Sequence, residues 1–261
     1  MPFTPAHPAA VLPLIRRPLV ASALVAGAVA PDLLYVGVIY RIATQLNGNF
    51  TLTLTHEFTS ALWLDPLLAL LLLAAFQLIL RRPLIALAPA ALAARLPAPD
   101  RLRPLWVIVS AILGAVTHVV WDSFTHGDGY FVRQFPGFFR AEVAAGWDVN
   151  RILQYVSTVG GCLILAVWLY RWYRRTPARV THDEKVPGWV RYLVLGALVL
   201  FAVVGAVVEL GRANGGLAGE TAVRLVLSGL ASGGLAALGW YVVLWHLVRL
   251  RRLRNATDGV M

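Results

Sequence analysis

The sequence predicts an all-α membrane protein, a polytopic transmembrane helical bundle with about six spans and a short N-terminal hairpin helix. Of its 261 residues, 59% are hydrophobic and 14% are charged, whereas a soluble domain typically carries about 25% charged residues. Apolar runs recur along the chain at the length of about 20 residues that a helix needs to cross the hydrocarbon layer. The basic residues collect in short clusters between these runs, as topology signals do.

The predicted spans follow from these apolar runs. They cover residues 18–40, 62–80, 104–124, 150–173, 189–211 and 221–248. The apolar piece 7–15 is too short to cross a bilayer, and we expect it to fold back as a half-hairpin that turns at Arg16-Arg17-Pro18. We expect one integral membrane domain over 1–261, with the candidate functional residues in 1–130 and three further spans in 150–248.

The charge distribution predicts an orientation. Most of the 23 basic residues fall in connections that share one side of the membrane if every span crosses. The positive-inside rule then places both termini in the cytoplasm, with the protein in the plasma membrane and the connections 41–61 and 125–149 outside. The net charge of +10 could suggest that the protein binds nucleic acid, but this distribution of the basic residues argues against it. The expected partner is membrane lipid. The one cysteine, Cys162, excludes an intrachain disulfide and a thiolate metal site.

Ionisable residues within apolar segments are the candidates for function, because each costs free energy unless it is paired or hydrated. His118, Asp122 and His126 are spaced i, i+4, i+8. Each step of four advances about 40° around a helix and about 6 Å along it, so the three side chains line one stripe. The stripe suits a divalent metal bound by His118 and Asp122, with His126 reaching it from the helix end or holding a second ion. The alternative is that Asp122 caps the helix while the histidines lie at the membrane interface.

Three further residues favour the metal interpretation. His7, Asp32 and His56 reach the same outer depth as the stripe under the predicted topology. Imidazole and carboxylate groups are ligands that zinc accepts, and that iron and manganese tolerate. We therefore predict a site for one or two divalent ions, with zinc favoured. Unrelated hydrogen-bonded polar residues are the alternative. Asp65 is interpreted either as a partner that supports a metal ligand or, in preference, as a snorkelling residue that extends to the interface.

The predicted outer connection 125–149 mixes aromatic and charged residues. Such a segment suits the lipid headgroup layer. Arg133 and Arg140 are candidates for holding an anionic headgroup, since the arginine fork matches phosphate. The connection is interpreted either as a lid over the metal site or as an ordinary interfacial loop.

Several local motifs resemble one known family. They are the opening Met-Pro-Phe-Thr-Pro-Ala-His7-Pro, then Ala30-Pro31-Asp32, Thr55-His56, and Thr117-His118-x-x-x-Asp122-Ser123-x-Thr125-His126-Gly127. They resemble the bacterial membrane family described as domain of unknown function 4184, over most of the chain and most densely in its first 130 residues. That family is similar to bacterial membrane-bound metal-dependent hydrolases and, more distantly, to zinc-dependent phospholipase C. The resemblance implies that five residues are metal ligands: His7, Asp32, His56, His118 and Asp122. His126 matches a sixth ligand by its spacing alone.

One departure from the phospholipases concerns the number of ions. Those enzymes have a second His-x-x-x-Glu/Asp pair downstream that this sequence lacks, which points to one or two ions in place of three. The leading hypothesis is a metal-dependent hydrolase acting on a lipid phosphoester at the outer leaflet, with Asp122 or Asp32 bridging ions or acting as general base. The alternative is a non-catalytic protein, either a scaffold or a metal carrier. Transport is disfavoured because the polar residues cluster in one half of the membrane.

Overall fold

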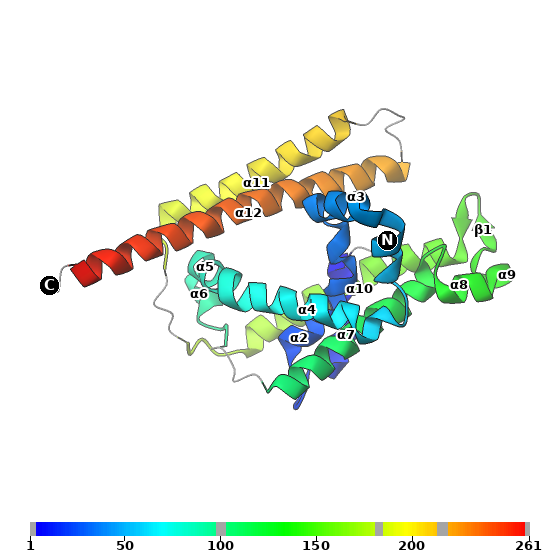
Figure 1. Cartoon of the computed structure of the whole chain (residues 1–261), viewed down its shortest axis with the longest axis horizontal. Helices are drawn as coiled ribbons and strands as arrows, with labels where there is room; N and C mark the ends of the chain where they lie inside the picture. The colour runs from blue at the N-terminus through cyan, green and yellow to red at the C-terminus, as the bar shows by residue number, and fades with distance from the viewer. Residues whose placement is uncertain (1–3, 98–102, 181–184, 213–218, 259–261) are drawn as a thin grey trace. The chain divides into compact units, whose positions relative to one another are not determined.

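The computed structural model describes residues 4–97, 103–180, 185–212 and 219–258, and these residues are mostly helical (Figure 1). The strands within these ranges form one two-stranded antiparallel hairpin. The predicted all-α fold class is therefore confirmed.

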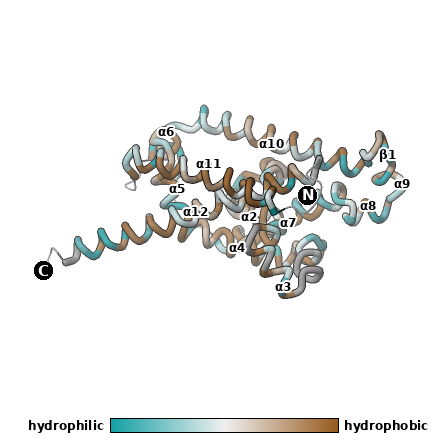
Figure 2. The backbone as a smooth tube through the Cα atoms, turned by 90° about the horizontal axis from the view of Figure 1, so that it is seen from above, coloured by the Kyte–Doolittle hydropathy of each residue, from teal (hydrophilic) through white to brown (hydrophobic). Residues whose placement is uncertain are grey.

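Within the described residues, five helices are long and apolar enough to cross a membrane. They cover Leu64–Leu87, Pro104–Gln134, Val149–Arg175, Gly188–Gly211 and Thr221–Asn255. Each corresponds to a predicted span. In the most apolar window of Val149–Arg175 no residue is buried inside the protein, and apolar residues predominate along the tube of α11 (Figure 2). Such faces need lipid around them, which agrees with an integral membrane protein.

The first predicted span, 18–40, is not one long helix. It contains α2 (Ala21–Val29) and the 3₁₀ segment η3 (Ala30–Tyr35), and this apolar stretch is shorter than the other five. The α pattern ends here because Pro31 has no N–H to donate to the preceding turn. The chain is extended at Val36 and then forms α3 (Gly37–Leu54). The prediction of a loop over 41–61 was wrong for this helical part.

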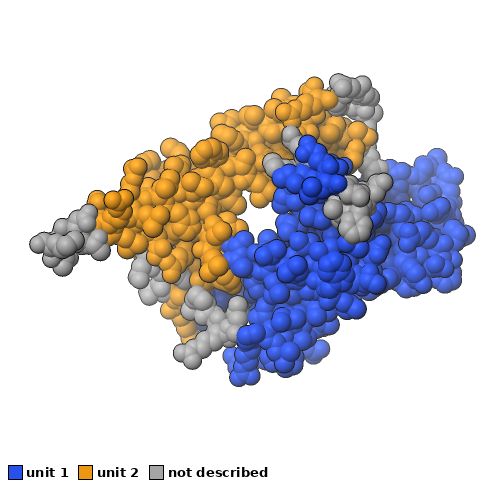
Figure 3. All heavy atoms as spheres, in the orientation of Figure 1, with its two compact units in different colours: residues 1–75, 97–178 blue, residues 76–96, 179–261 orange. Residues whose placement is uncertain are grey.

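The chain divides into two compact units, drawn in different colours in Figure 3. Unit 1 comprises residues 1–75 and 97–178, and unit 2 comprises 76–96 and 179–261. Unit 1 contains η1 (Thr4–Ala6), α1 (Pro8–Val11), η2 (Leu12–Leu14), α2, η3, α3, η4 (Ser60–Leu62), α4 (Leu64–Ala75), α7 (Pro104–Thr125), α8 (Tyr130–Gln134), α9 (Pro136–Phe139), β1 (Glu142–Ala144), β2 (Trp147–Asp148) and α10 (Val149–Arg175). Unit 2 contains the π-helical turn η5 (Phe76–Leu80), α5 (Arg81–Leu87), α6 (Ala90–Ala93), α11 (Gly188–Gly211) and α12 (Gly219–Asp258).

The core of unit 1 is built on small residues between α2, α4 and α7. Ala23, Ala26, Ala69 and Ala111 are among its buried members. Two glycines let α2 and α7 approach at backbone distance: a Cβ at Gly27 would collide with the Ala111 carbonyl oxygen, and one at Gly114 with the Leu24 carbonyl oxygen. Close backbone approach at small residues is a common means of helix association in membranes, where burial of apolar surface adds little.

Unit 2 pairs α11 with α12 in the same way, and it adds polar contacts to helix carbonyls. Gly205 and Gly229 face each other across the α11–α12 contact with no room for a Cβ. Three side chains donate hydrogen bonds to carbonyls spaced four residues apart, all 2.9 Å long: His246 Nε2 to Ile79, Tyr241 Oη to Pro83, and Arg191 Nε to Leu87. Pro83 cannot supply the α-helical donor for the Ile79 carbonyl, so His246 replaces it. His246 thus has a hydrogen-bond partner within unit 2.

Tyr241→Phe tests the row of three hydrogen bonds to the Ile79, Pro83 and Leu87 carbonyls, which we call the carbonyl ladder. The substitution removes only the buried hydroxyl that bonds Pro83, so we expect the free energy of unfolding in bicelles to fall by about 0.6–1.7 kcal/mol, as for other hydrogen bonds between membrane helices. Tyr192→Phe in α11 is the control, because that ring is 77% exposed. Equal stability of the two variants would contradict the role of the ladder.

Candidate metal centre

Helix α7 carries His118 and Asp122 towards its C-terminal end, and His126 follows directly as its C-cap. His118 and Asp122 are buried, with 0% and 3% of their surface exposed. The close approach of α2 at Gly114 brings the Ala28 carbonyl to 2.7 Å from His118 Nδ1. Because a carbonyl can only accept, Nδ1 carries the proton and Nε2 is left with its lone pair. A backbone carbonyl behind the ring is a typical support of a metal-ligating histidine.

Asp32 is supplied by the break after α2. It lies in η3 directly after Pro31 and is 2% exposed. The Thr4 hydroxyl donates a 2.6 Å hydrogen bond to Asp32 Oδ2, which leaves Oδ1 directed at the histidines. The break after α2 shortens the first apolar segment. The same break directs the Asp32 carboxylate towards the site.

His56 comes from the turn between α3 and η4. Its Nδ1 lies 3.1 Å from the Thr55 hydroxyl, and Thr55 is fully buried. When Nδ1 donates to that hydroxyl, Nε2 again is the free ring nitrogen. The His56 side chain is 19% exposed, more than its buried neighbours.

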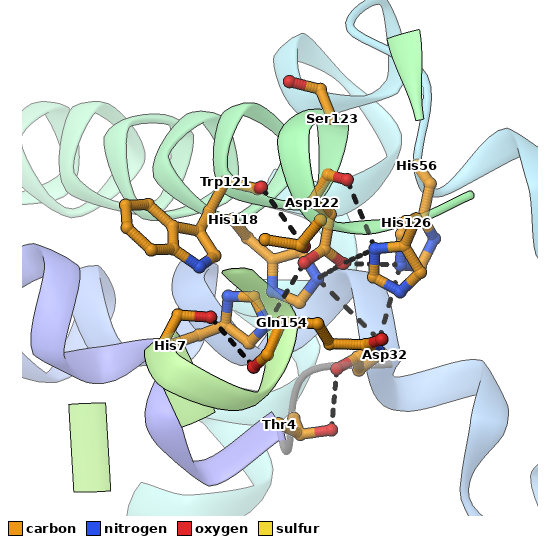
Figure 4. Close-up of polar contacts among 12 residues, drawn as sticks. Thr4, His7, Asp32, His56, His118, Trp121, Asp122, Ser123, His126 and Gln154 are labelled. Carbon is orange, nitrogen blue, oxygen red and sulfur yellow. Dashed lines mark hydrogen bonds and ion pairs between the residues drawn. The ribbon is translucent and has the colours of Figure 1, made fainter. Parts of the chain in front are cut away.

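Four ligand atoms from these segments meet at one point (Figure 4). His56 Nε2 lies 3.4 Å from both Asp32 Oδ1 and Asp122 Oδ2. His118 Nε2 lies 3.2 Å from Asp122 Oδ2 and 3.7 Å from Asp32 Oδ1, and all four atoms are within 4.8 Å of one another. Ligands at the usual zinc distance of about 2.1 Å in a tetrahedron are about 3.4 Å apart. The four spacings between a histidine and an aspartate lie near this value. Two atoms at the 4.8 Å limit cannot both lie about 2.1 Å from one ion, so binding of a zinc-sized cation would draw the widest pair together.

His7 and His126 complete the surroundings of Asp122. The His7 ring stacks on His118 with centroids 3.8 Å apart, and its Nε2 is 3.5 Å from Asp122 Oδ1. His126 Nδ1 is 3.4 Å from Asp122 Oδ2, and its side chain is 18% exposed. All six predicted ligands are therefore brought together within unit 1, with His7 on one carboxylate oxygen and three histidines on the other.

The charge balance of the cluster calls for a cation. Asp32 Oδ1, both carboxylate oxygens of Asp122 and the Nε2 atoms of all four histidines are buried without a hydrogen-bond partner among the described residues. Burial lowers the pKa of His7 to about 4, which makes it neutral. Burial also acts to lower the pKa of His56, but the close carboxylates of Asp122 and Asp32 outweigh it and raise the pKa to about 10. Two buried carboxylates need a compensating positive charge. Without a metal ion a protonated His56 supplies part of it, and a metal ion bound at the same point would supply it while also satisfying the unpartnered nitrogens.

Asp65 and the two arginines differ from the metal ligands. Asp65 is 0% exposed and accepts a 3.1 Å hydrogen bond from Ser60, so the prediction that it snorkels was wrong. Asp65 lies in the first turn of α4, and its partner Ser60 belongs to the segment that follows His56. Arg133 and Arg140 are exposed residues outside the cluster, and Arg140 Nη2 donates to the Gly127 carbonyl at 3.0 Å. Their role at a headgroup stays a prediction.

Thr4 and Thr55 are supporting residues that the sequence did not single out, although both lie in the motifs that carry the family resemblance. Thr4→Val keeps the shape of the side chain and removes the bond that orients Asp32. We expect metal affinity to fall about 10–100-fold, as for other residues that support ligands. Competition titration with a chelator measures it, with Thr44→Val as the control since the Thr44 hydroxyl bonds a carbonyl of its own helix. Unchanged affinity in Thr4→Val would show that Asp32 needs no such support.

Comparison with known proteins gives a family and no relative of known activity. One family model, described as "Domain of unknown function (DUF4184)", matches residues 1–244. No curated protein and no solved structure matches the chain.

Proposed function

This chain belongs to the family described as Domain of unknown function (DUF4184), and we propose that it is a membrane-embedded metal-dependent hydrolase that binds one or two divalent ions, zinc above others. The observation that carries the proposal is the convergence of Asp32, His56, His118 and Asp122. These side chains come from three separate segments and are held by supporting bonds from Thr4, Thr55 and the Ala28 carbonyl. Ionisable groups gathered at such cost in an apolar protein favour a functional site.

The ligands fit a hydrolytic centre. A zinc ion bound there would lower the pKa of a coordinated water to about 7 and polarise a phosphoryl or carbonyl oxygen. Asp122 Oδ1 lies 3.5 Å from His7 Nε2, whereas the nitrogens of His56 and His118 approach the other oxygen, Oδ2. Asp122 and His7 are thus placed to accept the proton of an attacking water. The partial exposure of His56 and His126 leaves an approach for the substrate on their side.

The site's depth favours a lipid phosphoester. His118, Asp122 and His126 lie at the C-terminal end of α7, and His56 precedes α4. Both helices are candidate spans, so these ends lie near a membrane surface. The positive-inside rule assigns that surface to the outside and the C-terminus to the cytoplasm. Thr4 and His7 contact the site, so the start of the described chain lies near the same surface, contrary to the predicted cytoplasmic N-terminus. An ester bond at the level of the headgroups is the bond such a centre would reach.

Hydrolysis in reconstituted membranes tests the proposal. We expect the protein in nanodiscs to release a phosphorylated headgroup or phosphate from phospholipid, to lose this activity on chelation, and to regain it with added zinc. Asp122→Asn should abolish turnover, because it removes a ligand charge and the proton acceptor together. Asp128→Asn, an exposed aspartate nearby, is the matched control. Stoichiometric metal with no turnover of any phosphoester or carboxylic ester would refute the hydrolase and favour a non-catalytic metal-binding protein.

A further inference from the structure

The connection between α7 and α10, residues 126–148, is an ordered structure with its own small core. We call it the aromatic connector. It contains α8, α9 and the β1–β2 hairpin. Val132 and Phe139 are buried, and Phe131 stacks on Phe124 of α7 with centroids 4.2 Å apart. Phe139 also packs at 6.0 Å from Phe124. The connector is thereby fixed to the end of α7.

This internal core leaves other large apolar side chains of the connector exposed. Phe135 and Phe138 are 59% and 62% exposed, Val143 is 64% exposed, and Tyr130 and Trp147 are 45% and 43% exposed. The connector alternates between hydrophilic and hydrophobic residues, as Figure 2 shows around α8, α9 and β1. Arg133 and Arg140 are also exposed, together with Asp128 and Glu142.

The position of the connector restricts what can cover this surface. It joins α7, which forms most of the candidate span Pro104–Gln134, to α10, which is the candidate span Val149–Arg175; α8 belongs to the last residues of the first of these spans. A segment between two consecutive spans must lie at a membrane surface, and aromatic side chains mixed with arginines are typical of the interfacial layer there. The connector exposes both acidic and basic side chains. Such a mixed surface suits contact with lipid headgroups better than contact with a strongly charged macromolecule.

The connector also borders the exposed edge of the metal cluster. The Tyr130 ring contacts Phe58 edge to face at 5.4 Å, and Phe58 lies two residues after His56. The Arg140 bond to Gly127 fastens α9 next to His126. His56 and His126 are the two ligands whose side chains are partly exposed.

We propose that the aromatic connector inserts its exposed rings into the lipid headgroup layer and delivers the substrate to the metal cluster from the lipid phase. The inference rests on the proposed function for its substrate, a phospholipid held at the connector by its phosphate. The insertion itself needs only the exposed rings and the two flanking spans. Phe135 and Phe138 anchor the connector, while Arg133 and Arg140 pair with phosphate groups at the same level.

Depth measurement tests the insertion without any assay of activity. In a Cys162→Ser background, Phe138→Cys is labelled with an environment-sensitive fluorophore and placed in nanodiscs with spin-labelled lipids. We expect blue-shifted emission and strong quenching by lipids labelled near the headgroup. Lys185→Cys, at an exposed position outside the candidate spans, is the control and should emit as in water. Equal emission and quenching at both positions would overturn the proposal.

A second experiment separates delivery from chemistry. The double variant Phe135→Ser/Phe138→Ser should bind metal as the unaltered protein does and keep its turnover of a soluble short-chain phosphoester, but lose turnover of phospholipid in bilayers. Equal loss on both substrates, or no loss on either, would contradict delivery through the connector. If the unaltered protein hydrolyses neither substrate, the proposed function fails while the depth measurement still decides the insertion.

Discussion

His118→Ala is expected to empty the metal centre. His118 is fully buried, its Nε2 lies 3.2 Å from Asp122 Oδ2, and its Nδ1 is held by the Ala28 carbonyl. Alanine removes one of the four converging ligands, and among the described residues the imidazoles left beside the site are His7 and His126. We expect the purified unaltered protein to carry stoichiometric divalent metal and the variant to carry little. Elemental analysis after purification without added chelator measures both.

The control for His118→Ala is His118→Asn, which keeps a polar side chain of similar shape but a weaker ligand. We expect it to fold and to bind metal weakly. The fold of both variants is checked by thermal melting, since removal of a ligand also leaves Asp32 and Asp122 as uncompensated buried charges. Full metal content in folded His118→Ala would contradict the proposed ligand set.

Gly114→Ala is expected to give the largest loss of stability. A Cβ at this position would collide with the Leu24 carbonyl oxygen and approach the backbone of Ala28. Both obstacles are backbone atoms, so α2 and α7 must separate. Overpacking of this kind costs about 1–3 kcal/mol, and more where backbone cannot move. The melting temperature in detergent should fall, and metal should be lost as well, because the Ala28 carbonyl that orients His118 moves with α2.

The matched control is Gly160→Ala in α10, where an added Cβ meets nothing within 4 Å. Alanine has the higher helix propensity, so this variant should melt no lower than the unaltered protein. A Gly114→Ala protein that keeps both its melting temperature and its metal would show that the helix crossing is looser than described.

Local pattern was sufficient to predict five of the six spans and the stripe of candidate ligands at the end of α7. Apolar length identifies a span without knowledge of its neighbours, and the i, i+4 spacing of His118 and Asp122 fixes their common face. The convergence of His7, Asp32 and His56 was expected from similar membrane depth and from the resemblance. Depth alone does not fix a distance, and the 3.4 Å approaches of His56 to both aspartates come from tertiary packing.

Other features depend on contacts that sequence pattern does not encode. Helix α3 contains many polar residues, so a criterion based on hydropathy does not identify it as a helix. Asp65 is buried because the turn before α4 folds over it and Ser60 bonds it, which no local property predicts. The supporting role of Thr4 depends on a contact across 28 residues. Pro31, by contrast, is visible in the sequence, and the helix break that it causes divides the predicted span 18–40 into α2 and η3.

X-ray absorption spectroscopy at the edge of the bound metal tests the central claim most directly, since it reports the atoms around the ion. The account predicts a first shell of nitrogen and oxygen at about 2.0–2.2 Å, with the outer-shell scattering of at least two imidazole rings, lost in His118→Ala. A sulfur shell, a shell of oxygen without imidazole scattering, or a spectrum unchanged in His118→Ala would contradict it.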